Sequence, residues 1–131
     1  MDAKQQHYVP QFYLEGFTDP GQPNSIWVYD RNTGDVRLQG VRNTGVAGYF
    51  YSLKHPTGER DNLIDRAIND KYENAAAPII RRWRSERPPM IVNSDLEPIA
   101  RFLGVTYVRS PRVRKDWEEL MAADARAMLK A

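Results

Sequence analysis

Short apolar runs separated by turn residues fill the first half of the chain. Residues 26–29 and 36–38 are rich in β-branched and aromatic side chains and flank an Asp/Asn/Thr/Gly turn, a pattern that predicts a β-hairpin. A cluster of Pro, Gly and Asn at residues 18–24 marks a loop before this hairpin. The apolar segment at residues 49–53 predicts a further strand. We therefore expect a small antiparallel sheet of about three short strands.

The second half of the chain changes to a helical period. Apolar residues recur at three- and four-residue spacing between positions 63 and 83, which predicts an amphipathic helix with Asp61 as its N-cap. Pro78 lies inside this segment. Because proline lacks a backbone N–H and clashes with the preceding turn, we expect a kink or a break in the helix there.

Two more helices are predicted towards the C-terminus. Ser94 and Glu97 have the spacing of a capping box, which predicts a helix from about residue 95 to residue 109. We expect this helix to bury Leu96, Ile99, Leu103, Thr106 and Tyr107. Ser110 followed by Pro111 predicts the start of a third helix. The apolar side chains of that helix are Val113, Trp117, Leu120, Met121, Met128 and Leu129.

The order of these elements indicates the α+β class. A sheet-forming half is followed by a helical half, so about three helices from the C-terminal half would cover the small antiparallel sheet of the N-terminal half. The length of 131 residues is typical of one domain with its own core. We therefore expect residues 1–131 to form a single domain.

Residues 6–17 combine a high density of aromatic side chains with one histidine and two glutamines. This density is not typical of a disordered tail, and we expect an extended piece followed by a helical turn after Pro10, wedged between sheet and helices. Packing accounts for Tyr8, Phe12, Tyr13, Leu14 and Phe17. His7 and Gln11 are the pair whose role packing does not explain.

The composition excludes several classes of protein. The chain has no cysteine, which excludes disulfide frameworks, thiol catalysis and cysteine-ligated zinc or iron–sulfur sites. Its first residues lack the pattern of a signal peptide, and no apolar run approaches the ~20 residues that span a bilayer. The net charge is only +2, so the charge balance alone does not indicate nucleic-acid binding. We expect a soluble, cytoplasmic protein without a membrane partner.

Three polar residues carry the candidate chemistry. Imidazole titrates near neutral pH, so His7 is a candidate acid or base, and the alternative is a histidine that orients a buried segment. Glu73 lies two helical turns after Asp65 and can share a face with it. If Glu73 points inward it needs a cationic partner, for which Arg109 is the best placed, and the alternative is a solvated helix face.

Metal and cofactor sites are not indicated. His55 lies in a turn-forming segment and is expected to be an exposed loop residue. A metal site would depend on Asp30, Asp61, Asp65 or Glu73, which have no ligand spacing, so we expect no metal. The serines lack a nucleophile elbow and the glycines form neither a P-loop nor a dinucleotide fingerprint, so serine hydrolases and nucleotide-cofactor enzymes are not favoured and no cofactor is expected.

Basic residues gather in two groups. The first is Arg81, Arg82, Arg84 and Arg87, and the second is Arg109, Arg112, Arg114 and Lys115. If the helices form a hairpin, the groups could merge into a basic patch that binds nucleic acid or a nucleotide through phosphate. The alternative is that these residues complement the helix dipole at helix C-termini and contribute to solubility.

Four segments carry a family resemblance, namely residues 6–17, 26–30, 49–52 and 102–111. With the opening sequence HYVPQFYLEGF and the later YVRSP, the chain resembles a largely bacterial family known as domain of unknown function 4238. The resemblance covers nearly the whole chain and implies no established activity. His7 and Arg109 are the polar residues that match the family pattern.

Two hypotheses of function follow. The first is a phosphodiester- or nucleotide-directed enzyme, such as a nuclease in a defence or toxin-like context. Its catalytic residues would be His7, Arg109 and Glu73, with His7 as acid or base and Arg109 on phosphate, and its binding residues Gln11, Asp30 and Arg112. The second is a non-catalytic binding or protein-interaction module in which the same residues form a structural polar network. A protein partner or a second copy would dock on Trp27 or on the C-terminal helix through Trp117 and Met128, and the alternative is that these side chains belong to the core.

Overall fold

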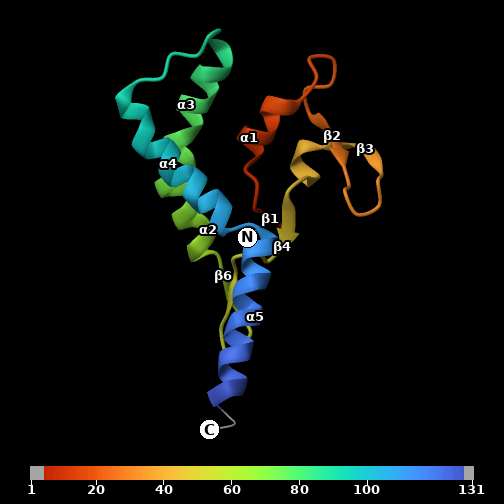
Figure 1. Ribbon diagram of the computed structural model, residues 1–131, viewed down its shortest axis with the longest axis vertical. Helices are drawn as coiled ribbons and strands as arrows, with labels where there is room; N and C mark the ends of the chain where they lie inside the picture. The colour runs from red at the N-terminus through yellow and green to blue at the C-terminus, as the bar shows by residue number, and fades with distance from the viewer. Residues whose placement is uncertain (1–4, 129–131) are drawn as a thin grey trace.

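The computed structural model describes residues 5–128 and has the expected α+β class (Figure 1). The strands are β1 (Gln5–His7), β2 (Ser25–Tyr29), β3 (Val36–Gly40), β4 (Val46–Gly48), β5 (Leu53–Lys54) and β6 (Arg60–Asp61). The α-helices are α1 (Gln11–Leu14), α2 (Leu63–Ile68), α3 (Asn74–Ser85), α4 (Asn93–Val108) and α5 (Pro111–Met128). Single turns of other helix types are η1 (Glu15–Phe17), η2 (Val41–Asn43) and η3 (Asn69–Glu73).

The strands pair as three antiparallel sheets of two strands each. The predicted hairpin is confirmed as β2 and β3, with Trp27 opposite Leu38. β1 pairs with β4, which places His7 opposite Val46. The strand predicted at residues 49–53 is wrong for most of its length. Tyr49 has a φ of 53°, in the left-handed region, so the chain turns there and cannot extend until β5 begins.

The long helix predicted between residues 63 and 83 is interrupted, but not at Pro78. The interruption is the π-helical turn η3, and Pro78 lies within α3. The ring of a proline clashes with the carbonyl oxygen four residues before it, which for Pro78 is the carbonyl of Asn74. The wider π-helical turn η3 ends at Glu73, directly before the residue where this clash would occur. The N-cap is Asn62, one residue later than predicted, although the Asp61 carboxylate accepts the Leu63 amide at 3.2 Å.

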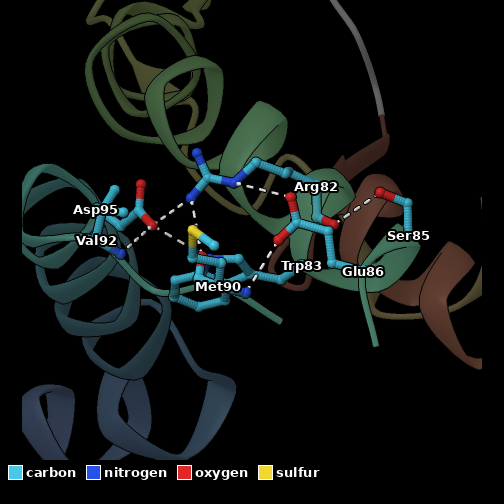
Figure 2. Close-up of polar contacts among 7 residues, drawn as sticks. All are labelled: Arg82, Trp83, Ser85, Glu86, Met90, Val92 and Asp95. Atoms are coloured by element: carbon cyan, nitrogen blue, oxygen red, sulfur yellow. Dashed lines mark hydrogen bonds and ion pairs between the residues drawn. The ribbon is translucent and has the colours of Figure 1, made fainter. Parts of the chain in front are cut away.

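The start of α4 is fixed by Asp95, and the predicted capping box of Ser94 and Glu97 is wrong. Figure 2 shows Asp95 facing the end of α3, where its Oδ2 accepts the Val92 amide at 3.1 Å and the Trp83 indole at 3.2 Å. Arg82 forms an ion pair with the same oxygen. Asp95 therefore caps α4 and joins α3 to it.

This buried carboxylate predicts a loss of stability in acid. Burial alone would raise the pKa of Asp95, but the hydrogen bonds from Val92 and Trp83 and the charge of Arg82 hold it below its usual value. Because the folded state then binds the proton less tightly than the unfolded state, the stabilisation is present above about pH 4 and is lost as the pH falls through the lowered pKa. Urea unfolding between pH 7 and pH 2 should show this loss.

Two variants provide the comparison for that titration. Asp95→Asn should be less stable than the wild type at neutral pH, and the difference should shrink below about pH 4. Asp124→Asn, an exposed position on α5, is the matched control and should follow the wild type throughout. A difference between Asp95→Asn and the wild type that stays constant to pH 2 would contradict this role.

The core consists of two clusters, one on each side of α1. Phe12, Ala76, Ala77 and Phe102 form the helical cluster, with Ile80 and Ile99 packed against it. Leu14, Ile26 and Val41 form the hairpin cluster, with Val9 and Val28 packed against it. In Figure 1, α1 lies between the α3–α4 pair and the β2–β3 hairpin. Phe12 and Leu14 of the opening stretch are therefore buried between the two halves, and the predicted wedge is confirmed for these two residues.

Several side chains expected in the core are exposed. On α4, the buried face is formed by Asp95 and Phe102, whereas Leu96, Leu103 and Tyr107 are exposed. Asp95 lies on the inward face of α4 because it caps the helix. The buried face of α4 therefore passes through Asp95 and Phe102 and not through the predicted Leu96 and Leu103. In the opening stretch Phe17 and Tyr13 are also exposed, at 63% and 37%.

The last helix, α5, starts at Pro111 as predicted and extends away from both core clusters (Figure 1). Its apolar residues Trp117, Leu120, Met121 and Met128 are all exposed. Leu129, which was assigned to the same face, lies outside the described residues. No helix within residues 5–128 is both long enough and apolar enough to cross a membrane.

Candidate functional site

Gln6 is the buried polar centre of the N-terminal half. Its side chain is 1% exposed and its Oε1 accepts the Tyr51 amide at 2.5 Å. Its Nε2 donates to Asn62 Oδ1 at 2.8 Å and to Ser52 Oγ at 3.1 Å, and the Ser52 hydroxyl also donates to Asn62. This network joins β1 to the turn before β5 and to the N-cap of α2.

Main-chain groups hold the ring of His7 and the residues that follow it. Its ring Nε2 lies 3.0 Å from the carbonyl oxygen of Arg42 in η2, so that nitrogen is engaged by the main chain. The residues that follow His7 are fixed at Gly45, whose carbonyl accepts the Tyr8 amide at 2.8 Å. Gly45 has a φ of 64°, and a side chain there would lie 2.8 Å from Val9 Cβ, so only glycine fits.

Four of the predicted polar residues line one small pocket. Its volume is about 280 Å³, and His7, Gln11, Asp65 and Glu73 contribute to its wall. Asp65 and Glu73 share a face, as their spacing predicted. Burial raises the pKa of Asp65, although the nearby charges of Arg109 and His7 act in the opposite direction. The pocket therefore holds a histidine and two carboxylates, of which Asp65 has a raised pKa and Glu73 forms an ion pair with Arg109.

Arg109 is the buried cation of the helical half, and its predicted partner is confirmed. Its Nη1 lies 2.5 Å from Glu73 Oε1, and its side chain is 4% exposed while that of Glu73 is 19% exposed. Arg109 Nε and Nη2 are buried and have no hydrogen-bond partner among the described residues. This arginine is thus satisfied on one side only.

The ion pair predicts a measurable contribution to stability. Replacing Glu73 with glutamine keeps the shape but removes the charge, which should lower the free energy of unfolding by about 2 kcal/mol because Arg109 would remain buried without a counter-charge. The effect falls below that of a fully buried pair since Glu73 reaches solvent. Urea unfolding at pH 7 measures it.

The exposed pair of Glu97 and Arg101 on α4 provides the control. Glu97→Gln should change the free energy of unfolding by less than about 0.5 kcal/mol, because exposed ion pairs are screened by water. Equal effects of Glu73→Gln and Glu97→Gln would contradict a stabilising role for the Glu73–Arg109 pair.

A second and larger pocket has a volume of about 610 Å³. Arg109 and Tyr51 line it, whereas His7 does not. The hydroxyl of Tyr51 is buried and has no hydrogen-bond partner among the described residues. Burial raises the pKa of Tyr51 despite the opposing charge of Arg109, so this phenol stays protonated at neutral pH. His7 and Arg109 therefore contribute to different pockets.

The remaining predicted residues lie elsewhere. Asp30 is in the hairpin loop, where its carboxylate accepts the amides of Asn32 and Thr33 at 2.9 and 3.4 Å. This is an Asx-turn contact, which explains the aspartate without a functional role. Arg112 is exposed in the first turn of α5. Neither residue is brought to His7.

The two basic groups do not merge. The helices α3 and α4 do form a hairpin, but this arrangement places the end of α3 beside the start of α4, so the groups lie at opposite ends of the pair (Figure 1). Several members are also used structurally. Arg82 pairs with Asp95, and Arg84 donates to the carbonyl oxygens of Phe12 and Glu15 at the end of α1. The predicted single basic patch is therefore wrong.

The prediction for His55 is confirmed, whereas two polar residues of the pockets were not predicted. His55 is exposed, as predicted, and its Nε2 lies 2.7 Å from Asp61 Oδ2, a hydrogen bond that lowers the pKa of Asp61. Within the part of the chain that the structure describes, histidine and acidic side chains form no group of three that could hold a metal. Sequence reasoning missed Gln6, because β1 is too short for alternation to show which face is buried, and it missed Tyr51, because the strand predicted at residues 49–53 does not form over most of its length.

Comparison with known proteins adds a family but no activity. No curated protein and no solved structure matches the chain. A match to the family described as "Protein of unknown function (DUF4238)" extends over residues 5–131, nearly the whole length. This agrees with the resemblance carried by the opening aromatic stretch and the YVRSP segment. The chain belongs to the DUF4238 family of proteins of unknown function.

Proposed function

We propose that this protein is a non-catalytic binding module in which the polar residues of the opening stretch serve the fold. The observation that carries the proposal is the division of the polar groups between two pockets. His7 lines the smaller pocket with one ring nitrogen on the Arg42 carbonyl, and Arg109 lines the larger pocket with Glu73 on one edge. An acid–base group and a phosphate-binding group must approach the same substrate. This arrangement therefore favours binding over turnover.

A phosphodiester- or nucleotide-directed enzyme is the second candidate. It is favoured by the 280 Å³ pocket, in which His7, Gln11 and Glu73 lie together beside Asp65. In such an enzyme His7 would act as acid or base through the ring nitrogen that does not contact Arg42. Arg109 does not line that pocket, so Arg109 would bind a phosphate held beside His7 only if its pair with Glu73 opened.

The experiment that separates the two candidates is a turnover assay. The protein is incubated with labelled RNA, DNA and nucleoside triphosphates, alongside His7→Gln, which keeps a hydrogen-bond donor for the Arg42 carbonyl. The binding module predicts no turnover of any substrate by either protein. His55→Gln is the matched control, because His55 is an exposed loop histidine. Turnover that is lost in His7→Gln and kept in His55→Gln, with both variants folded, would overturn the proposal in favour of the enzyme.

A further inference from the structure

The 610 Å³ pocket has a mostly apolar wall built from three parts of the chain. The segment at residues 50–52 forms one side, α2 the second, and the end of α4 with the first turns of α5 the third. The apolar side chains in this wall are Phe50, Ile64, Ile68, Val105, Val108 and Trp117. Its volume lies within the range of about 300–1,000 Å³ that is typical of small-molecule sites.

Two residues of this wall, Arg109 and Tyr51, carry three hydrogen-bond donors that have no acceptor among the described residues and are covered by neighbouring atoms. Two are Arg109 Nε and Nη2, and the third is the Tyr51 hydroxyl, all of them buried. The Nε–H and one Nη2–H of a guanidinium point the same way and form a flat edge that matches the two oxygens of a carboxylate. Glu73 occupies Nη1 and leaves this edge unused. A buried donor without a partner is unfavourable, so the site lacks an acceptor group.

The charges around the pocket are compatible with an added anion. Arg109 faces Glu73 on its Nη1 side, and neither Glu73 nor Asp65 lines this pocket. At the outer part of the pocket, Arg114 Nε pairs with Glu118 at 2.8 Å, and the Arg114 guanidinium carbon lies 4.9 Å from the centre of the Phe50 ring. Glu118 thus balances the charge of Arg114, whereas the Nε–Nη2 edge of Arg109 has no acceptor among the described residues.

We propose that this pocket binds a small monocarboxylic acid with an apolar body. When the ligand enters, the side chains that cover the Nε–Nη2 edge of Arg109 and the Tyr51 hydroxyl move aside, and the carboxylate accepts hydrogen bonds from both groups. The apolar body packs along Ile68, Val105 and Trp117. The inference rests on the proposed function and deepens it, because it names the class of ligand that the binding module takes.

Gly104 provides a sharp test of the site. It lines the pocket from the middle of α4, and a side chain added there would meet open space within 4 Å. Gly104→Leu should therefore fold at least as stably as the wild type, because leucine is the better helix former, while its side chain fills the pocket. Ala100→Leu, at an exposed position on the same helix outside this pocket, is the matched control.

Titration calorimetry with decanoate, below its micellar concentration, measures binding. Decanoate should bind the wild type and Ala100→Leu equally and should not bind Gly104→Leu. The neutral alcohol 1-decanol, of the same length, should bind at least about tenfold more weakly, because hydrogen bonds to a charged group are the stronger ones. Tyr51→Phe removes only a hydroxyl that has no partner, so it should remain folded and bind decanoate several-fold more weakly.

Each other outcome overturns the inference. Equal binding of decanoate and 1-decanol would indicate a merely apolar groove, and unchanged binding in Gly104→Leu would place the ligand elsewhere. No binding of decanoate would contradict the carboxylate site. A dimer in sedimentation that Gly104→Leu abolishes would mean that a second copy, and not a small acid, occupies the wall. The turnover assay is read independently, so the binding module can stand when the carboxylate site fails.

Discussion

Replacing Gln6 with alanine should lower the free energy of unfolding by about 3–5 kcal/mol, since the Tyr51 amide left without its acceptor costs about 1–3 kcal/mol and the cavity left by the buried side chain adds to this loss. Gln6 is 1% exposed. The substitution removes the acceptor of the Tyr51 amide and one of the donors to Asn62 Oδ1. It also separates β1 from the turn before β5. Urea unfolding at neutral pH, followed by circular dichroism, measures the change.

Gln5→Ala is the matched control for this effect. Gln5 belongs to the same strand, but its side chain is exposed, so its removal should change the free energy of unfolding by less than about 0.5 kcal/mol. A change below about 1 kcal/mol in Gln6→Ala would mean that water replaces the lost amide at little cost, against a structural role for the network.

Replacing Phe102 with alanine should lower the free energy of unfolding by about 3–5 kcal/mol, the usual cost of a large-to-small substitution in a core. Phe102 is 2% exposed, and its ring centroid lies 5.5 Å from that of Phe12. The substitution would leave a cavity between α1 and the α3–α4 pair. Thermal and urea unfolding both report this loss.

Leu103→Ala tests the orientation of α4 by comparison. Leu103 is 56% exposed, and the change should cost less than about 1 kcal/mol. The sequence pattern favoured Leu103 as a core residue, and the structure favours Phe102. A larger loss of stability in Leu103→Ala than in Phe102→Ala would therefore restore the orientation inferred from the sequence.

The elements that sequence reasoning predicted well are governed by local chemistry. The hairpin of β2 and β3 follows from its turn residues, and the start of α5 follows from Ser110 and Pro111. The pair of Glu73 and Arg109, which are 36 residues apart, was predictable for a different reason, because an inward carboxylate requires a cation. Where the signal lies within a few residues, the sequence is sufficient.

The features that could not be predicted depend on distant contacts. Asp95 faces inward because Arg82 and Trp83 of the preceding helix meet it there, and this shifts the buried face of α4. The turn η3 adds a residue to the helical path, so the faces of α2 and α3 differ by about 100° from a continuous helix. No local pattern indicated that Gln6 would meet Tyr51 and Asn62, which lie 45 and 56 residues away.

The short helix α1 has a consequence for how the molecule opens. Phe12 and Leu14 are two residues apart and therefore point about 200° away from each other, so each belongs to a different core cluster. Since the hairpin cluster has its own small set of apolar contacts, β2 and β3 are expected to behave as a separate cooperative unit in native-state hydrogen exchange. Their amides would exchange through an opening that leaves α3 and α4 folded, with α1 as the boundary between two levels of protection.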